Sequence, residues 1–435
     1  MASLRDLTRR IIPPPLRRRL VSLALSLQPR GLEESAIGHW LPVIARRQER
    51  LRLNLVVPSV SPAQAYGGIN TCVAFLHELS GLISAQGIAH ELRAIVTNDD
   101  VPAETVFSLL PPARRFSVPV SCVAVHAHAT GFETGPRDIF FATTWWTAHN
   151  LFPVLRSRHA AFGGVPIPLF HFIQDYEPQL YPLSSSSLLA RDVYANDWPT
   201  AGIFNSQLLA DYFAAQGHRL SHQFVFEPLM PAALQAHLPR LGSVPKARQI
   251  LVYGRPQEAR NCFSLVRMGL QSFAARHSRY ADWQILSAGA PHAPIALGGG
   301  REAKSVGKLS LADYADTLLS SAVGLSLMAS PHPSYPPLEM AHFGLLTVTN
   351  GFANKDLSRF HENCVSLQRV HPDAIADALA AACARLEADP ACGLKGKSFM
   401  PGYSSGSGFA CAPDVARLIA EIDAAGRAVP QELTP

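Results

Sequence analysis

Apolar and polar positions follow a repeating rhythm along the first half of the chain. Short apolar runs of strand length are separated by longer segments with helical spacing, an order typical of a parallel sheet covered by helices. The run at 53–60 predicts the first strand, and a glycine turn leads from it into a helical stretch at 73–87. Further strands are predicted at 91–97, 120–126, 138–142, 167–174 and 201–205.

The same rhythm restarts after a proline- and leucine-rich crossing at 228–245. Strands are predicted from Ile250 onward and at 282–289, 322–328, 345–350 and 364–367, with helices at 262–275, 311–320 and 373–387. We therefore expect an α/β protein with two doubly wound, Rossmann-like domains, which bind ligands at the carboxyl ends of their strands. The expected parts are a basic extension at 1–50, a first domain at 51–235, a second at 236–395, and a segment at 396–435 that crosses back to the first domain.

Composition agrees with two globular cores. The chain has 435 residues of which 48% are hydrophobic, enough apolar surface for two separate domains. Its seven cysteines include no C-x-x-C pair, which favours a reducing, cytoplasmic compartment over a disulfide framework.

Positive charge is concentrated at the N-terminus. Residues 1–52 carry eleven arginines against four acidic residues, a net of +7 in a chain whose total is +5. Arginines alternate there with leucines and isoleucines, a pattern that indicates either peripheral contact of residues 1–30 with a membrane surface or a solvated extension. Nucleic acid is a weaker alternative. The apolar run at 20–27 is far shorter than the ~20 residues that span a bilayer.

The block at 330–350 is the most informative for chemistry. A proline-rich loop runs directly into a helix, where the backbone N–H groups of Ser334 and Tyr335 are expected to face a phosphate or sugar oxygen. Glu339, one turn into the helix, can accept two hydroxyl hydrogen bonds, as a ribose diol offers. The alternative is an ordinary strand-to-helix connection with an exposed glutamate.

Two arginines follow the first strand of the second domain. Arg255 and Arg260 lie five residues apart on one loop, and two guanidinium groups there can hold a diphosphate. Taken alone, they can equally be solvated surface residues.

The order of these blocks resembles the donor-binding half of GT-B glycosyltransferases of the family-4 type. The resemblance implies that Arg255 and Arg260 bind the diphosphate of a nucleotide sugar and that Glu339 binds its ribose. It also implies that Gly67 and Gly68, after the first strand, face the donor phosphates from the other domain. A closer resemblance is to the WsaF-type rhamnosyltransferases, carried by AYGGINT, HFIQDYEPQLYP, FNS, YGRPQEARNCF and SPHPSYPPLEMAHFG over about residues 53–390.

Members of that group build bacterial surface polysaccharides from dTDP-activated L-rhamnose. The resemblance therefore implies a hexosyltransferase with dTDP-L-rhamnose as donor and a glycan or lipid-linked saccharide as acceptor. It implies no cofactor beyond this donor substrate. The chain contains no D-x-D motif, which agrees with a metal-independent reaction in which arginines and helix N-termini neutralise the departing diphosphate. A cytoplasmic enzyme at the inner face of the membrane would suit such an acceptor.

Two departures from the broader family keep other functions open. The family often has a glutamate eight positions before the one matching Glu339, where this chain has Pro331, and a histidine where this chain has Thr143 to Trp146. A non-catalytic glycan- or nucleotide-sugar-binding scaffold on the same fold is therefore the alternative function, and a sugar-nucleotide epimerase is a further one.

Polar residues near the end of the strand at 167–174 are the candidates for catalysis. His171, Asp175 and Glu177 are expected near the reacting centre, with Asp175 or Glu177 as the base that accepts the proton of the acceptor hydroxyl. The alternative is that Asp175 caps a helix and Glu177 is solvated. Trp145 and Trp146 can stack on an acceptor sugar or pack in the core.

His126 and His128 form an H-x-H pair without further ligands nearby in sequence, so no metal is assigned.

Overall fold

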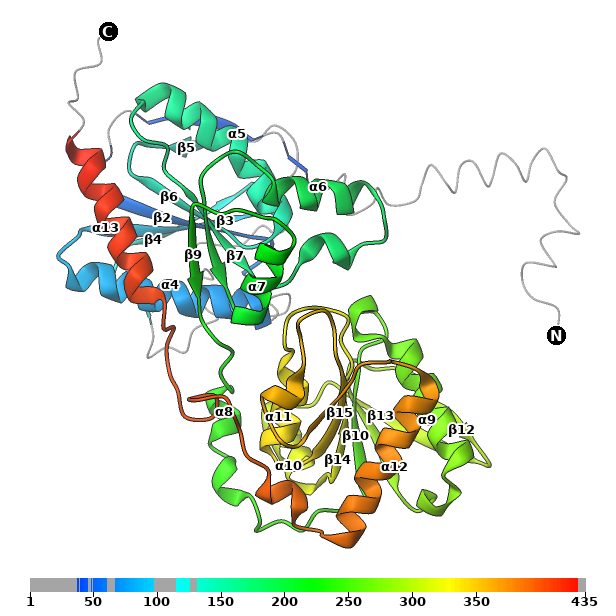
Figure 1. Cartoon of the computed structure of the whole chain (residues 1–435). Helices are drawn as coiled ribbons and strands as arrows, with labels where there is room; N and C mark the ends of the chain where they lie inside the picture. The colour runs from blue at the N-terminus through cyan, green and yellow to red at the C-terminus, as the bar shows by residue number, and fades with distance from the viewer. Residues whose placement is uncertain are drawn as a thin grey trace, which may run out of the picture.

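The computed structural model describes residues 37–428 except for 39, 46–47, 49, 61–66, 98–114 and 126–130. The basic segment at 1–30, Tyr66, and the His126 and His128 pair therefore lie outside the described residues. Two lobes are seen in Figure 1, each built around one sheet.

The N-terminal domain is built on a seven-stranded parallel sheet with the order β4-β3-β2-β6-β7-β8-β9. Its central strands are buried along their whole length and are mostly apolar, although the first of them contains the buried polar residues Arg52 and Asn54. The strands are β2 (Leu51–Val57), β3 (His90–Val96), β4 (Val120–Ala124), β6 (Asp138–Ala142), β7 (Leu169–Ile173), β8 (Thr200–Phe204) and β9 (His222–Val225). The helices are α4 (Gly67–Ala85), α5 (Trp145–Phe162), α6 (Ser185–Tyr194) and α7 (Gln207–Ala215), and β1 (Leu41–Ile44) pairs with β5 (Gly131–Thr134) in a separate ribbon.

The C-terminal domain repeats this plan with the order β12-β13-β11-β10-β14-β15-β16. All neighbours are parallel except the antiparallel edge pair β12 and β13. The strands are β10 (Gln249–Gly254), β11 (Gln284–Gly289), β12 (Ile295–Gly298), β13 (Arg301–Gly307), β14 (Val323–Leu325), β15 (Leu346–Asn350) and β16 (Cys364–Leu367). The helices are α9 (Phe263–Arg276), α10 (Leu311–Ser320), α11 (Tyr335–His342) and α12 (Pro372–Ala388), and α8 (Ala232–Gln235) lies in the connection between the domains.

Both sheets reverse their winding at the first strand of the domain. β2 has β3 on one side and β6 on the other, and β10 likewise lies between β11 and β14. Ligands of doubly wound sheets bind at the carboxyl ends of the strands beside such a switch point. Two Rossmann-like domains in tandem form the GT-B architecture, and the predicted fold class is confirmed.

The chain returns to the N-terminal domain at its end. Helix α13 (Ala412–Ala428) packs on α4, and its buried Val415 and Ile419 belong to the core of the N-terminal domain. Two polar contacts fix this return: both carboxylate oxygens of Glu78 accept from the N–H of Phe409, and Arg137 donates to Asp423 at 2.7 Å. Figure 1 shows α13, in red, alongside the N-terminal domain.

Five short strands are absent from the sequence prediction: β1, β5, β9, β12 and β13. β9 and β12 lie at sheet edges, β13 lies between β12 and β11, and β1 and β5 form the two-stranded ribbon. Such strands are partly exposed and carry mixed polar residues, so their apolar periodicity is weak.

Candidate functional site

Asp175 connects the two domains by hydrogen bonds. This residue follows β7 and is 5% exposed, and its carboxylate accepts hydrogen bonds from Arg260 and, at 2.5 Å, from the hydroxyl of Ser330. Arg260 follows β10 and Ser330 follows β14, so both partners come from the switch point of the C-terminal sheet. The carboxyl ends of strands from both sheets therefore face each other at this contact.

The loops that reach this junction are conformationally strained. Among the described residues, Cys262, Ser334 and Ala353 are the only non-glycine residues with a left-handed φ, at 51°, 70° and 49°. They lie in the loops after β10, β14 and β15, on the side of the sheet that faces the N-terminal domain. Strained backbone of this kind is concentrated at functional sites, where packing over-determines the conformation.

The two predicted diphosphate ligands have different surroundings. Arg260 is engaged by Asp175 across the domains, whereas the Nη2 of Arg255 donates to Glu258 of its own loop at 3.0 Å. The side chains of Arg255 and Arg260 are 29% and 33% exposed. Both guanidinium groups are thus accessible, and a diphosphate that binds Arg260 has to compete with the Asp175 carboxylate.

The loop before α11 corrects one expectation. The N–H of Ser334 donates to Nδ1 of His332 at 2.9 Å, so this N–H is not available to a ligand. Tyr335 opens the helix, but Pro336 and Pro337 follow it and have no N–H. Of the groups predicted to bind phosphate at this helix start, only the Tyr335 N–H remains.

Glu339 lies on the buried face of α11 rather than in solvent. It is 7% exposed, and its Oε2 accepts from the Tyr314 hydroxyl at 3.0 Å. Burial raises the pKa of Glu339 to about 7, because the charged carboxylate is poorly solvated there. The carboxylate retains lone pairs for further hydroxyl donors.

His171, predicted to lie near the reacting centre, is buried and cannot touch a substrate. His171 lies inside β7, is 1% exposed, and stacks on the Tyr194 ring at 5.7 Å between centroids. Burial lowers its pKa to about 3, so the ring is neutral at physiological pH. The strand-end polar residues Gln174 and Asp175 reach the edge of the sheet, but the side chain in mid-strand points into the core.

Glu177 is partly buried rather than solvated, and it interacts electrostatically with Asp175 and Arg260. Its carboxyl group accepts from the Tyr194 hydroxyl at 3.0 Å and from the backbone N–H of Trp145. Burial raises the pKa of Glu177 to about 8, so the free protein holds this group largely protonated at neutral pH. Asp175 accepts from the following N–H, that of Tyr176, at 2.8 Å, in addition to its two partners across the domain boundary.

Gly67 and Gly68 open α4 beside the strand that carries Asp175. The carbonyl of Gly68 accepts from the Gln174 side chain at 3.3 Å, and a Cβ at Gly68 would lie 2.8 Å from that amide oxygen. A side chain at Gly68 would therefore displace the end of the Gln174 side chain, whereas a Cβ at Gly67 would meet open space. Trp145 is a core residue at 1% exposed.

Two buried residues of the junction escaped sequence reasoning. His332, at 5% exposed, interacts electrostatically with Asp175, Arg260 and Lys355, and Lys355 is 2% exposed. Lys355 donates to the carbonyl of Met328 at 2.6 Å and follows β15, the next strand of the sheet. Their positions in the sequence could have indicated both residues, since each comes shortly after a predicted strand of the C-terminal domain.

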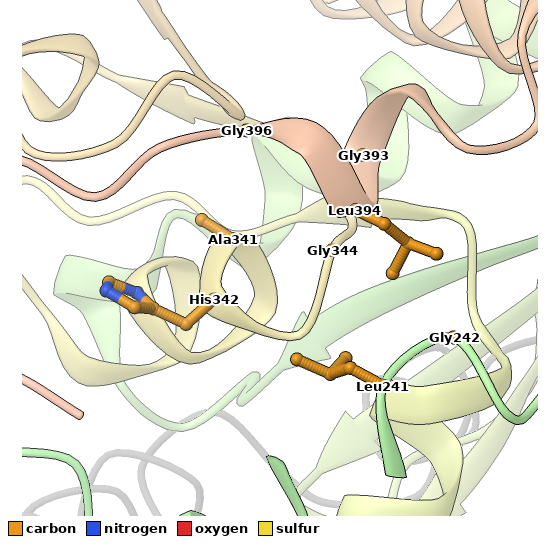
Figure 2. A pocket seen from close by; sticks show the side chains of 8 residues that line it. All are labelled: Leu241, Gly242, Ala341, His342, Gly344, Gly393, Leu394 and Gly396. Atoms are coloured by element: carbon orange, nitrogen blue, oxygen red, sulfur yellow. The ribbon is translucent and has the colours of Figure 1, made fainter. Parts of the chain in front are cut away.

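A separate hollow of about 220 Å³ lies at the far end of α11 (Figure 2). Its lining is mostly glycine and apolar, with Leu241 and Leu394 beside the Gly344 turn. Small-molecule sites usually measure about 300–1,000 Å³ and contain convergent polar groups. The only titratable side chain here, His342, already pairs both ring nitrogens, with the Leu338 carbonyl and the Ser398 hydroxyl. We do not assign the donor to this hollow.

Two other kinds of feature, a metal-binding cluster and a membrane-spanning helix, are absent from the described ranges. No three His, Cys, Asp or Glu side chains there are grouped so that they could hold a metal ion. None of the helices in the same part of the chain is both long and apolar enough to cross a bilayer.

Family comparisons match both domains. The family "WsaF, N-terminal domain" matches residues 52–207, and "WsaF, C-terminal domain" matches residues 248–380. The chain belongs to the WsaF family. The two matched ranges contain every site residue discussed above, from Gly67 to Lys355.

Individual relatives of this WsaF-family chain have low sequence identity to it. The O-antigen biosynthesis protein RfbC of Myxococcus xanthus is 32% identical over 232 residues, which are 52% of this chain but only 17% of that protein. This chain thus spans about a sixth of that relative. Among solved structures, α,α-trehalose 6-phosphate synthase from Burkholderia multivorans is similar with a TM-score of 0.52 and 12% identity, over 87% of this chain and 100% of that one. WaaG, a glycosyltransferase involved in lipopolysaccharide biosynthesis, has a TM-score of 0.49 at 12% identity, over 84% and 99%. The TM-score of 0.52 supports the shared fold.

Proposed function

We propose that this protein is a metal-independent glycosyltransferase of bacterial surface polysaccharide synthesis that transfers a sugar from a nucleotide-sugar donor to a glycan or lipid-linked acceptor. The donor we propose is dTDP-L-rhamnose, as the resemblance to WsaF-type rhamnosyltransferases implies. The name of the Myxococcus xanthus relative, an O-antigen biosynthesis protein, supports the same biological setting.

The contact of Arg260 with Asp175 carries this proposal. It brings a guanidinium of the C-terminal domain and a carboxylate of the N-terminal domain together at the carboxyl ends of both sheets. Doubly wound sheets bind nucleotides at this edge. A cation on one side and a carboxylate on the other are the groups needed to hold a diphosphate leaving group and to orient an acceptor hydroxyl.

In the proposed reaction, the acceptor oxygen bonds to the anomeric carbon as the bond from that carbon to the diphosphate oxygen breaks. Arg255 and Arg260 stabilise the negative charge that grows on the departing diphosphate. Asp175 or Glu177 takes the proton of the acceptor hydroxyl; a pKa raised to about 8 leaves only a minor ionised fraction of Glu177 able to do so near neutral pH. Glu339 binds the 3′-hydroxyl, the one free hydroxyl on the deoxyribose of this donor.

Contact with the inner face of the membrane through residues 1–30 is part of the same proposal. Its basis is the alternation of arginine with apolar residues in that segment. Deleting residues 1–30 should move the protein from the membrane fraction to the supernatant after cell lysis. Unchanged membrane recovery of the shortened protein would contradict this part.

Calorimetric titration of the purified protein with dTDP, UDP and GDP tests the proposed donor. We expect binding of dTDP that is lost on Arg255→Ala and weakened on Glu339→Ala, followed by rhamnosyl transfer in an assay with dTDP-L-rhamnose. Preferred binding of UDP or GDP would replace the proposed donor. Absence of binding by any of the three would favour the non-catalytic scaffold.

Donor binding should depend on pH through Glu339. Because burial raises the pKa of this carboxyl to about 7, it is mostly protonated at pH 6 and ionised at pH 8, where it accepts more strongly from the 3′-hydroxyl of the deoxyribose. We expect dTDP affinity to rise by up to about tenfold from pH 6 to pH 8, since the ionised fraction falls tenfold per pH unit below the pKa.

The Glu339→Gln variant is the control for this titration. A phosphate group also titrates near pH 6, and the variant retains that contribution while losing the one from Glu339. Equal pH dependence in wild type and Glu339→Gln would show that Glu339 does not titrate on binding. Arg255→Lys, which leaves Glu339 in place, should keep the wild-type pH dependence.

A further inference from the structure

The hydrogen bonding of His332 fixes which of its ring nitrogens carries the proton. Nδ1 accepts the N–H of Ser334 at 2.9 Å, and an accepting imidazole nitrogen is unprotonated. Burial lowers the pKa of His332 to about 4, so the ring is neutral at physiological pH. The single ring proton is therefore on Nε2, and His332 presents a neutral N–H donor.

That donor has no partner among the described residues. The Nε2 atom of His332 is buried and makes no hydrogen bond, which is unfavourable if nothing binds there. His342, at the end of the next helix, pairs both of its nitrogens. His171 is also unpaired, but it lies within β7 against an aromatic ring, and burial is the sole influence on its pKa. His332 alone of these combines an unpaired donor with charged neighbours.

The charges around His332 indicate what kind of group the donor binds. Arg260 and Lys355 contribute two positive charges and Asp175 one negative charge. The ammonium group of Lys355 donates to a backbone carbonyl, that of Met328, and burial lowers its pKa to about 8, so it is mostly charged at neutral pH. A buried excess of positive charge is costly unless an anion offsets it.

We infer that His332 is a ligand-binding residue whose Nε2–H donates to a diphosphate oxygen of the nucleotide sugar, beside Arg260 and Lys355. This inference rests on the proposed function and adds a subsite to it. A neutral N–H together with two cations suits an anionic oxygen better than a sugar hydroxyl. The Ser334 N–H that keeps Nδ1 unprotonated then acts through His332 as a positioning group for the ligand.

Two substitutions at His332 separate ligand binding from a purely structural role. In His332→Asn the amide oxygen can replace Nδ1 as acceptor for Ser334, but the donor at the Nε2 position is lost. In His332→Gln the side-chain amide reaches the Nε2 position, but the acceptor near Ser334 is lost. Titration with dTDP, UDP and inorganic pyrophosphate should show about tenfold weaker binding for His332→Asn, as for one lost hydrogen bond to a charged group, and affinity within about threefold of wild type for His332→Gln.

Other outcomes would overturn the inference in distinguishable ways. A loss in His332→Gln with none in His332→Asn would mean that His332 only positions Ser334. A loss confined to dTDP-L-rhamnose, with dTDP and pyrophosphate unchanged, would mean that His332 contacts the sugar. Wild-type protein that binds none of the probes contradicts the proposed function itself, whereas binding that is unchanged in His332→Asn contradicts only this subsite.

Lys355→Met provides a second test if His332→Asn does not fold. The change removes the charge and keeps the length of the side chain. Pyrophosphate affinity about tenfold below that of wild type is expected. Unchanged affinity in a variant with the wild-type melting temperature would overturn the assignment of this cluster to the diphosphate.

Discussion

Replacing Arg260 with alanine should lower kcat/KM for glycosyl transfer by about 10²–10³-fold, the usual loss when one preorganised donor to a developing negative charge is removed. The guanidinium group of Arg260 donates a hydrogen bond to Asp175 of the other domain. The variant loses a charge-assisted contact to the leaving diphosphate, so both nucleotide affinity and the rate of the chemical step should fall. Steady-state kinetics with the donor identified by calorimetry measure the effect.

Two further variants serve as a comparison and a control for Arg260→Ala. Arg260→Lys retains the charge but not the planar fork that binds two oxygens, so an intermediate loss is expected. Arg279→Ala removes an arginine of the same domain that is 67% exposed and pairs with Glu387, and it should leave kcat/KM unchanged. Wild-type kinetics in Arg260→Ala would exclude this side chain from the donor site.

The Arg260→Ala substitution also changes the surroundings of Asp175. Without Arg260, the Asp175 carboxylate keeps only Ser330 and the Tyr176 N–H as partners. A buried carboxylate that loses its cation is destabilised. The melting temperature of Arg260→Ala should therefore be measured beside the kinetics, so that a loss of fold is not taken for a loss of chemistry.

Replacing Asp138 with alanine should destabilise the N-terminal domain by about 3–5 kcal/mol, the typical cost of removing one partner of a buried ion pair. Asp138 is fully buried at the start of β6 and accepts from Arg52 at 2.6 and 2.8 Å, from the Asn54 amide at 3.1 Å, and from the Gly135 N–H at 2.8 Å. Arg93 lies 3.7 Å away. The variant removes the buried carboxylate that two guanidinium groups share, and Arg52 keeps only partly exposed partners such as Glu133. Urea denaturation followed by tryptophan fluorescence measures the change.

An exposed ion pair in the same domain is the matched control. Asp197 pairs with Arg156 but is 80% exposed, so Asp197→Ala should leave the unfolding midpoint within experimental error. Equal effects of the two substitutions would contradict the importance of burial. The Asp138 network lies at the amino ends of the strands, opposite the junction with the C-terminal domain, so nucleotide affinity of any folded Asp138→Ala protein should be unchanged.

The same network predicts part of the acid sensitivity of the protein. Burial acts to raise the pKa of Asp138, but the hydrogen bond from Arg52 and the charges of Arg93 and Arg52 outweigh it, so the pKa is lowered. Stability from a carboxyl with a lowered pKa is present above its unfolded pKa of about 3.9 and is lost as the pH falls through the folded value. Unfolding midpoints of wild type should therefore fall more steeply below about pH 4 than those of Asp138→Ala.

Sequence periodicity was sufficient for the architecture because both sheets are buried on both faces. Strands such as β6 and β14 are mostly apolar and fully buried, with a helical segment after each, and this order fixes a doubly wound sheet. The positions of Arg255, Arg260 and Glu339 relative to the strands could be predicted for the same reason. A strand such as β13 could not, since only one of its residues is fully buried and its apolar periodicity is weak.

Burial and pairing depended on contacts between residues far apart in the sequence. Periodicity did not distinguish His171, which points into the core, from Asp175, which reaches the edge four residues later. Nor could it show that the N–H of Ser334 is taken by His332. Local sequence determines where a strand ends, but which side chains then meet depends on how two separately folded sheets pack together.

The sequence by itself determined the order of strands and helices, the two-domain architecture, and which loops follow the strands at the ligand-binding edge. Only the tertiary structure decided that Asp175 meets Arg260, that Lys355 and His332 join them, and that Asp138 is held by Arg52 and Arg93. The physical reason is that hydrophobic periodicity encodes local geometry, whereas charge pairing and desolvation are set by neighbours far apart along the chain, such as Arg260 and Asp175 at a separation of 85.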